Sequence, residues 1–409
     1  MLYFAHANPF VIQKHILLKE DPSVTSNGND TSNVIFIDFN NNMSLLFNEH
    51  KIIEFIDNIT SNHSMLSPLA TSLMQLLDIL LMIPNAYIVI HIERGQSQYH
   101  LNICKSYKAR RGEYVLLSEE QTQLWRNYFD IVREVFSDLL YRLPNVSVFS
   151  LDYMECDFIP YYLLQNRHSR AKGKWNSLLA ELEDINVFIS SSDKDMFQTA
   201  WFEEVKMFYR LVTSIKDERK KYMSPSDILY VLTNGKELYS REYSAKIQAA
   251  IVPFLLSVSG DSSDNVTGIK GLGIIRALEY FKDFLDKWGA EPDIFNYTTI
   301  GELRELYTRK LLPSLKNVLH AKKIEQNLEL ILMNHRLVDF KIISNDLPLD
   351  QLQKLDFLYE AHRKKVVFTP SEFEMFLKQL VTIEPVAINK LLTKYTQVYE
   401  KYTANKHNN

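Results

Sequence analysis

The segment SGDSSDNVTGIKGLG (259–273) holds four of the eleven glycines of this 409-residue chain, together with the acids Asp261 and Asp264. Closely spaced glycines let backbone amides approach an anion such as phosphate, because no side chain stands in the way. Carboxylates repel phosphate, so one segment carries groups suited to two different ligands. We interpret it as two halves, with the aspartates turned toward cations and the glycines toward a phosphate.

Upstream of this segment, four apolar runs are typical of buried parallel strands, namely 34–38, 87–93, 146–150 and 185–193. Segments with helical periodicity lie between them, at roughly 65–82, 118–142 and 155–166. Strands that alternate with helices predict an α/β fold with a central, mostly parallel sheet flanked by helices. After about residue 245 the pattern is helical, apart from a short strand expected in VDFKIIS (338–344) and a helix expected to start at Pro370.

Acidic residues stand where these strands end. Asp38 and Glu93 close the first two runs, and an acidic pair follows or ends each of the other two. The carboxyl ends of parallel strands form the ligand edge of an open α/β sheet. Eight acids are therefore expected to converge there: Asp38, Glu93, Glu155, Asp157, Asp193, Asp195, Asp261 and Asp264. Such a cluster needs divalent cations to offset its repulsion, and all-oxygen ligands favour magnesium or manganese. Taken singly, each acid is more often a helix N-cap or a turn former than a metal ligand.

A basic, tyrosine-bearing segment, KSYKARRGEY (105–114), follows the second strand. Its cations and rings suit a nucleic acid, whose phosphates pair with Lys and Arg and whose bases stack on aromatic side chains. Opposite a carboxylate–metal cluster, such cations fit phosphoryl transfer, in which charge on the reacting phosphate is stabilised. The alternative is an ordinary solvated loop.

The bulk composition excludes several classes of protein. A formal net charge of −4 means that any nucleic-acid surface is local. Cys104 and Cys156 form no CxxC pair, which argues against a disulfide framework or a thiolate metal site and favours a reducing, cytoplasmic setting. We expect no signal peptide and no membrane span, because polar residues and Pro84 interrupt the most apolar window, 73–92.

These motifs together resemble one known family. VIFIDFNN, IERGQS…SYKARR, ECD, SSDKD and GDSSDNVTGIKGLG occur in this order over residues 34–280. The chain thereby resembles the 5′-nuclease superfamily, which includes flap endonucleases and the 5′→3′ exonuclease domain of bacterial DNA polymerase I. The similarity points above all to bacteriophage flap endonucleases and phage enzymes of the RNase H type. The helical stretch at about 320–395 is also similar to the C-terminal domain of the phage RNase H.

The resemblance implies roles for particular residues. Acids matching Asp38, Glu93, Glu155 and Asp157 surround one magnesium ion, and those matching Asp193, Asp195, Asp261 and Asp264 serve a second from further out. Lys108 and Arg111 match catalytic residues that contact the scissile phosphate at the base of a helical arch. The implied DNA-binding residues are Tyr107 and Arg110 in the basic segment, and Gly268, Lys270, Gly271 and Gly273 in a helix–three-turn–helix at 259–280. The backbone of that motif often holds potassium. Manganese is expected to substitute for magnesium.

Three positions depart from the family pattern. Glu93 stands where most members have aspartate, Phe158 where bacterial and many phage members place another acid, and His100 where an arginine is common. The acids needed for one metal pair are all present, so an active enzyme is expected. The implied domains are an N-terminal extension (1–33), a nuclease core (34–240) with an arch at about 105–142, a DNA-binding region (241–312) and a helical C-terminal domain (313–409).

The function implied by the resemblance is a structure-specific 5′ nuclease, a 5′→3′ exonuclease or flap endonuclease, acting in replication or primer removal. It would act as a monomer in the cytoplasm, on DNA with 5′ flaps, nicks or ends. RNase H activity on RNA–DNA hybrids, and a partner such as a single-strand binding protein or clamp, stay open. The alternatives are a non-catalytic duplex-binding protein, a PIN-like ribonuclease, and a Toprim-type or receiver-like protein. Of these alternatives, only a duplex-binding protein would be expected to contain the glycine-rich segment 259–273.

Overall fold

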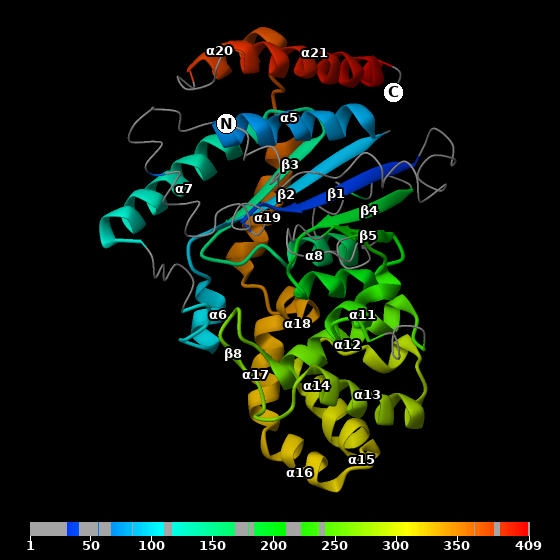
Figure 1. The fold of residues 1–409 in the computed structure, drawn as a ribbon. Coiled ribbons are helices and arrows are strands. Elements are labelled where there is room, and N and C mark those ends of the chain that lie inside the picture. Colours follow the sequence, from blue (N-terminus) through cyan, green and yellow to red (C-terminus); the bar gives the residue numbers. More distant parts are fainter. Residues whose placement is uncertain are drawn as a thin grey trace.

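Within the residues that the structure describes, six strands form the central sheet (Figure 1). The computed structural model describes residues 31–40, 56, 67–83, 85–109, 117–167, 179, 184–209, 222–236, 242–363, 365–379 and 385–407. The sheet order is β3-β2-β1-β4-β5-β6, and only the β5–β6 pair is antiparallel. The strands are β1 (Ser32–Asp38), β2 (Ala86–Arg94), β3 (Val146–Asp152), β4 (Ile185–Ser190), β5 (Val205–Tyr209) and β6 (Tyr222–Met223).

Both faces of the sheet are covered, which is why its strands are apolar at nearly every position. Successive side chains in a strand point to opposite faces, so Ile35 and Ile37 enter one core while Val34 and Phe36 enter the other. The first core packs against α5 (Ser67–Met82), α7 (Glu119–Tyr141), α20 (Pro370–Gln379) and α21 (Pro385–His407). Trp125 and Tyr128 of α7 are buried in it.

The last helix of the chain packs on the first described one. α21 runs along α5, and both Leu391 and Tyr395 are fully buried in the core between them. Lys394 pairs with Asp78, and the Lys401 ammonium donates to the carbonyl of Leu80 at 2.9 Å. Within the residues that the structure describes, no helix is long and apolar enough to cross a membrane.

The second core joins the sheet to a helical region on its other face. It contains α8 (Ile159–Asn166), the 3₁₀ helix η3 (Asp195–Trp201), α12 (Ala245–Ser259) and α18 (Phe340–Asn345). A third core lies beyond α12. The remaining elements are α6 (Gln98–Ile103), η4 (Pro225–Asp227), α11 (Ile228–Leu232), α13 (Ile274–Trp288), η5 (Pro292–Phe295), α14 (Ile300–Glu305), the π-helical turn η6 (Leu306–Leu311), α15 (Leu312–Ser314), α16 (Val318–Gln326), α17 (Leu328–Val338) and α19 (Leu349–Arg363).

The segment 259–273 forms a small hairpin and a turn between α12 and α13. α12 ends where Gly260 takes a positive φ of 76°, and β7 (Gly260–Asp261) then pairs with β8 (Val266–Thr267). A Cβ atom at Gly268 would lie 2.0 Å from the carbonyl oxygen of Ser259, so only glycine fits there. Buried Asn334 of α17 donates to the carbonyls of Ser257 and Thr267 at 2.8 and 2.9 Å, which fixes the hairpin on α12.

Three local predictions need correction. Segment 338–344 is not a strand, because Asp339 caps α18 there by accepting from the Lys341 amide at 3.1 Å. The fourth strand ends at Ser190 rather than Asp193. The helix expected from 155 begins at Ile159, and the residues before it form a turn. The helix predicted to start at Pro370 is confirmed, and the domain boundaries stay predictions.

Candidate metal centre

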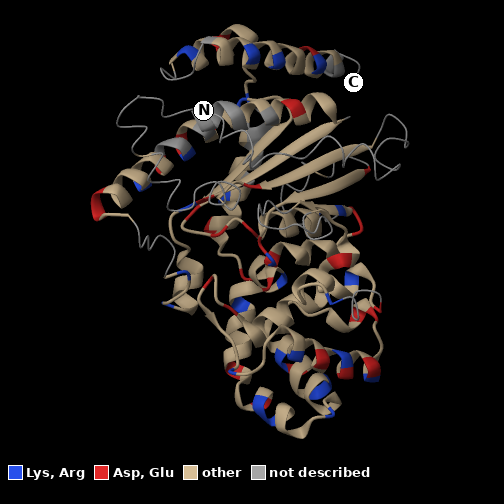
Figure 2. Cartoon of the chain, in the orientation of Figure 1, with Lys and Arg blue, Asp and Glu red and all other residues tan. Residues whose placement is uncertain are grey.

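Two strands place the first carboxylates of the site. Asp38 is the last residue of β1, on the face of the sheet that also carries Val34 and Phe36. Glu93 lies on the neighbouring strand, two residues beyond the one that pairs with Asp38. The Asn40 amide donates to the backbone carbonyl of Glu93 at 3.2 Å and reaches its side chain at 3.5 Å. Figure 2 shows acidic positions on the loops between the sheet and the helices below it.

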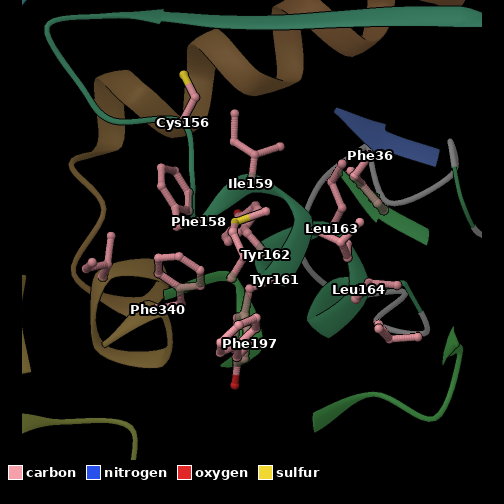
Figure 3. Packing of buried hydrophobic residues seen from close by; sticks show 14 of the residues in the cluster. Phe36, Cys156, Phe158, Ile159, Tyr161, Tyr162, Leu163, Leu164, Phe197 and Phe340 are labelled. Atoms are coloured by element: carbon pink, nitrogen blue, oxygen red, sulfur yellow. The ribbon is translucent and has the colours of Figure 1, made fainter. Parts of the chain in front are cut away.

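The turn after β3 adds two more acids. It is tied to β2 by the Tyr153 amide, which donates to the carbonyl of Arg94 at 2.7 Å, and by the Cys156 thiol, which donates to that of Ile92 at 3.3 Å. Figure 3 shows Cys156 and Phe158 among the buried side chains of the second core. The carboxylates of Glu155 and Asp157 lie close to that of Glu93, at the carboxyl end of β2.

The position of Phe158 explains one departure from the family pattern. Phe158 is 2% exposed and meets Tyr162 edge to face, with ring centroids 6.1 Å apart. The side chain at position 158 therefore belongs to the second core and not to the carboxylate cluster.

Four acids and one histidine can hold a cation. One oxygen each of Glu93, Glu155 and Asp157 lie within 4.8 Å of one another, and so do ligand atoms of Asp38, His91 and Asp157. Asp157 belongs to both groups. Burial, followed by the charges of Asp38 and Glu93, raises the pKa of Asp157 well above its usual range. Crowded, buried oxygen donors of this kind fit one or two divalent cations, which would restore the charged form.

The other four predicted ligands surround this centre without joining a common ion site. In the described part of the chain, no group of three ligand atoms within 4.8 Å of one another includes any of Asp193, Asp195, Asp261 and Asp264. Ser191 links them to the centre, because its hydroxyl donates to Asp38 at 2.9 Å and accepts from the Asp193 amide at 3.1 Å. Burial and then the charges of Asp193 and Asp264 raise the pKa of Asp195 well above its usual range.

Lys108 lies inside the carboxylate cluster. Its ammonium contacts Glu155 and lies 3.6 Å from Asp264 and 3.9 Å from Glu93. The backbone fixes this placement: Lys108 takes a positive φ of 50°, and its amide donates to the carbonyl of Asp264 at 2.9 Å. The lysine therefore bridges the strand-end acids and the acids of the hairpin, and it partly offsets their charge.

Tyr107 is buried beside Lys108. Its hydroxyl donates to Glu155 at 2.9 Å, and its ring is stacked on His100 with centroids 4.6 Å apart. His100 is held in turn by Ser97 at 2.7 Å and by the carbonyl of Leu337 at 3.2 Å. In this structure Tyr107 presents no open ring face to a nucleobase. It positions a carboxylate, and His100 supports it. The predicted residues Arg110 and Arg111 lie outside the described residues.

The glycines of the hairpin differ in the space around them. No atom lies within 4 Å of a Cβ placed on Gly273, whereas Gly271 has a positive φ of 81° with Lys323 and Arg276 beyond it. Lys323 donates to the carbonyl of Lys270, and Arg276 donates to that of Gly271 at 2.7 Å. The Gly271–Gly273 turn is thus an exposed backbone surface beside three cationic side chains, at the start of α13.

Sequence reasoning missed His91. The signal was present, because His91 and Glu93 are two residues apart in one strand and therefore share a face. Burial lowers the pKa of His91 to about 3, so its imidazole is neutral near pH 7.

In the metal-free protein, repulsion and burial in this acidic cluster should lower the free energy of unfolding in a pH-dependent way. The folded-state pKa of Asp195 is raised above 3.8, so this destabilisation is absent below that pH, grows as the pH rises through the folded pKa, and is then constant. In EDTA, Asp195→Asn should match the wild type near pH 4 and become the more stable protein as the pH rises. Its gain is about 1.4 kcal/mol for each unit by which folding raises the pKa. Thermal melts from pH 4 to 8 measure this, with exposed Asp350→Asn as control. A pH-independent difference would contradict it.

No family model and no curated protein sequence matches the chain. Among solved structures, it is similar to a bacteriophage T5 protein co-crystallised with metal ions (17% identity, TM-score 0.51, covering 81% of this chain and 98% of that one). It is also similar to the T5 5′-exonuclease with bound zinc (16%, 0.51, 82% and 98%). A third match is the T5 flap endonuclease in a pseudo-enzyme–product complex with DNA and metal ions (15%, 0.51, 81% and 100%). The fold prediction is confirmed: this chain has the 5′-nuclease fold, with a mostly parallel sheet flanked by helices.

Proposed function

We propose that this chain is a divalent-metal-dependent, structure-specific 5′ nuclease that hydrolyses phosphodiester bonds in DNA. The observation that carries the proposal is the convergence of Asp38, Glu93, Glu155 and Asp157 at the carboxyl ends of β1 to β3, with the Lys108 ammonium among them. A protein that only bound DNA would gain by losing these acids, because they repel phosphate. The T5 proteins of the same fold were crystallised with metal ions, and one of them with DNA.

Different residues would bind the metal ions, contact the scissile phosphate and position the ligands. Asp38, Glu93, Glu155 and Asp157 would hold one magnesium ion, with Asp193, Asp195, Asp261 and Asp264 serving a second from further out. Two such ions activate a water molecule and stabilise the leaving oxygen of an in-line displacement. Lys108, with Arg111, would contact the scissile phosphate and offset its charge. Tyr107 holds Glu155 in place through its hydroxyl group. The products would carry a 5′-phosphate and a 3′-hydroxyl.

The surface at the start of α13 would hold the duplex. The backbone amides at Gly271 and Gly273 and the side chains of Lys270, Arg276 and Lys323 suit one phosphate group. Potassium bound to backbone carbonyls stays part of the proposal, although cationic side chains already contact the carbonyls of Lys270 and Gly271. Segment 105–142 would admit the single-stranded 5′ end.

Product mapping tests the proposal. Substrates labelled at the 5′ end with a flap, a nick or a blunt end, and an RNA–DNA hybrid, are incubated with magnesium, with manganese and with EDTA. We expect cleavage at or near the flap junction that depends on metal. Cleavage of the hybrid would add RNase H activity. Metal-dependent binding without cleavage of any substrate would favour the non-catalytic alternative.

The Gly273→Val variant tests the duplex surface by itself. A Cβ at Gly273 meets no atom within 4 Å and its φ is an ordinary −74°, so the fold should be retained, with a small loss of stability because valine caps α13 less well than glycine. The side chain would keep a phosphate from the amides, and loss of one charge-assisted hydrogen bond of roughly 1.5 kcal/mol weakens duplex binding about tenfold. Fluorescence anisotropy with a labelled duplex measures this. Gly301→Val in α14 is the matched control, and equal affinity for both variants would exclude the contact.

A further inference from the structure

His91 lies directly beside Asp38 in the sheet. The parallel register of β1 and β2 pairs these two residues, and alternation along β2 puts His91 on the same face as Glu93. Asp157 approaches from the turn after β3, with its Oδ1 atom 3.7 Å from Nε2 of His91. The ring thus stands at the base of the carboxylate centre, between two acids that belong to it.

The ring has no hydrogen-bond partner that accounts for its burial. His91 is 1% exposed, and neither ring nitrogen makes a hydrogen bond to any described residue. Buried polar atoms in folded proteins are nearly always paired, because an unpaired one costs about 1–3 kcal/mol. His100, equally buried, has both nitrogens paired. An unpaired nitrogen directed at two carboxylates is the arrangement expected of a metal ligand.

Given the proposed metal centre, on which this inference rests, we propose that His91 is a nitrogen ligand to a divalent ion also bound by Asp38 and Asp157. Ligand atoms of the three lie within 4.8 Å of one another, a spacing that one ion with bonds of about 2.0–2.2 Å spans after small movements. Imidazole favours transition metals, whereas carboxylates also suit magnesium. The ion of this centre therefore has two alternative positions, of which position A (Asp38, His91, Asp157) favours a transition ion over magnesium. Position B (Glu93, Glu155, Asp157) has only oxygen ligands and suits magnesium.

The experiment uses Mn²⁺ bound to the full chain in the absence of DNA. Electron spin echo envelope modulation of the bound ion should show coupling to a ¹⁴N nucleus. The coupling should vanish in His91→Val and in His91→Asn, which keeps a polar side chain should the valine variant fail to fold. His320→Asn, a histidine on α16 away from the site, should keep it. In competition titrations, the preference for Mn²⁺ over Mg²⁺ should fall about tenfold or more in the His91 variants.

The outcomes separate this inference from the proposed function. Bound Mn²⁺ without nitrogen coupling, coupling that persists in both His91 variants, or no Mn²⁺ binding at all would overturn the role of His91. None of these results needs a substrate. Cleavage of flap DNA in magnesium, measured separately on the wild type, would still support the nuclease if the histidine were only a neighbour of the ion.

Discussion

Cleavage of 5′-flap DNA in magnesium should fall about a thousandfold or more when Asp157 is replaced by asparagine. Asp157 belongs to both ligand groups of the centre, so its loss removes an oxygen ligand from the ion whichever group binds it. Metal coordination contributes several kcal/mol to the stabilisation of such a transition state, and a loss of about 4 kcal/mol corresponds to a thousandfold. Single-turnover cleavage with saturating enzyme measures the effect apart from DNA binding, which should change little.

Stability separates lost chemistry from misfolding in this variant. Without metal, Asp157→Asn removes a buried like charge, so its melting temperature in EDTA at pH 7 should equal or exceed that of the wild type. With saturating magnesium the order should reverse, because the wild type gains more from binding. Asp152→Asn is the matched control: this acid ends β3, before the turn that holds Asp157, but it is half exposed and pairs with Lys354 at 3.6 Å. Wild-type cleavage by Asp157→Asn would remove it from the metal site.

Asp38 and Glu93 could be predicted as site residues from the sequence, because each stands at the end of an apolar strand. An apolar run that ends on Asp38 or Glu93 puts that side chain at the carboxyl edge, whatever the rest of the fold does. Asp157 came from weaker reasoning. The sequence predicts it in the first turn of a helix from 155, but the helix starts at Ile159, and the turn before it brings Asp157 to the strand-end acids.

What the sequence could not supply depends on contacts between distant segments. The sequence of the basic loop predicts that Tyr107 stacks on a base. In the structure its hydroxyl donates to Glu155 and its ring stacks on His100. The β-branched pair Ile342–Ile343 favoured a strand, but burial of Phe340 and Ile343 against the sheet-side core and of Ile342 in the third core suits a helix between the two. Propensity yields to packing in such short segments.

Replacement of Lys108 by methionine should lower the cleavage rate about 10²- to 10³-fold, with little change in duplex affinity. This is the usual cost of removing one preorganised group that stabilises transition-state charge. The metal-free protein should be less stable at pH 7, because Glu93, Glu155 and Asp264 lose the buried cation that partly offsets their repulsion. Metal affinity should rise instead, since the ammonium no longer competes for Glu155.

The expected rise in metal affinity, together with lower stability and slower cleavage, identifies the role of Lys108. A general loss of structure would lower all three quantities together. Single-turnover rates, isothermal titration with Mg²⁺ and melts in EDTA measure the three quantities on one preparation. Lys206→Met on β5 is the matched control, since this lysine is exposed and its ammonium donates to the carbonyl of Glu203 at 3.0 Å. If Lys108→Met lowers duplex affinity and leaves the single-turnover rate unchanged, the lysine holds the substrate in place and does not stabilise the transition state.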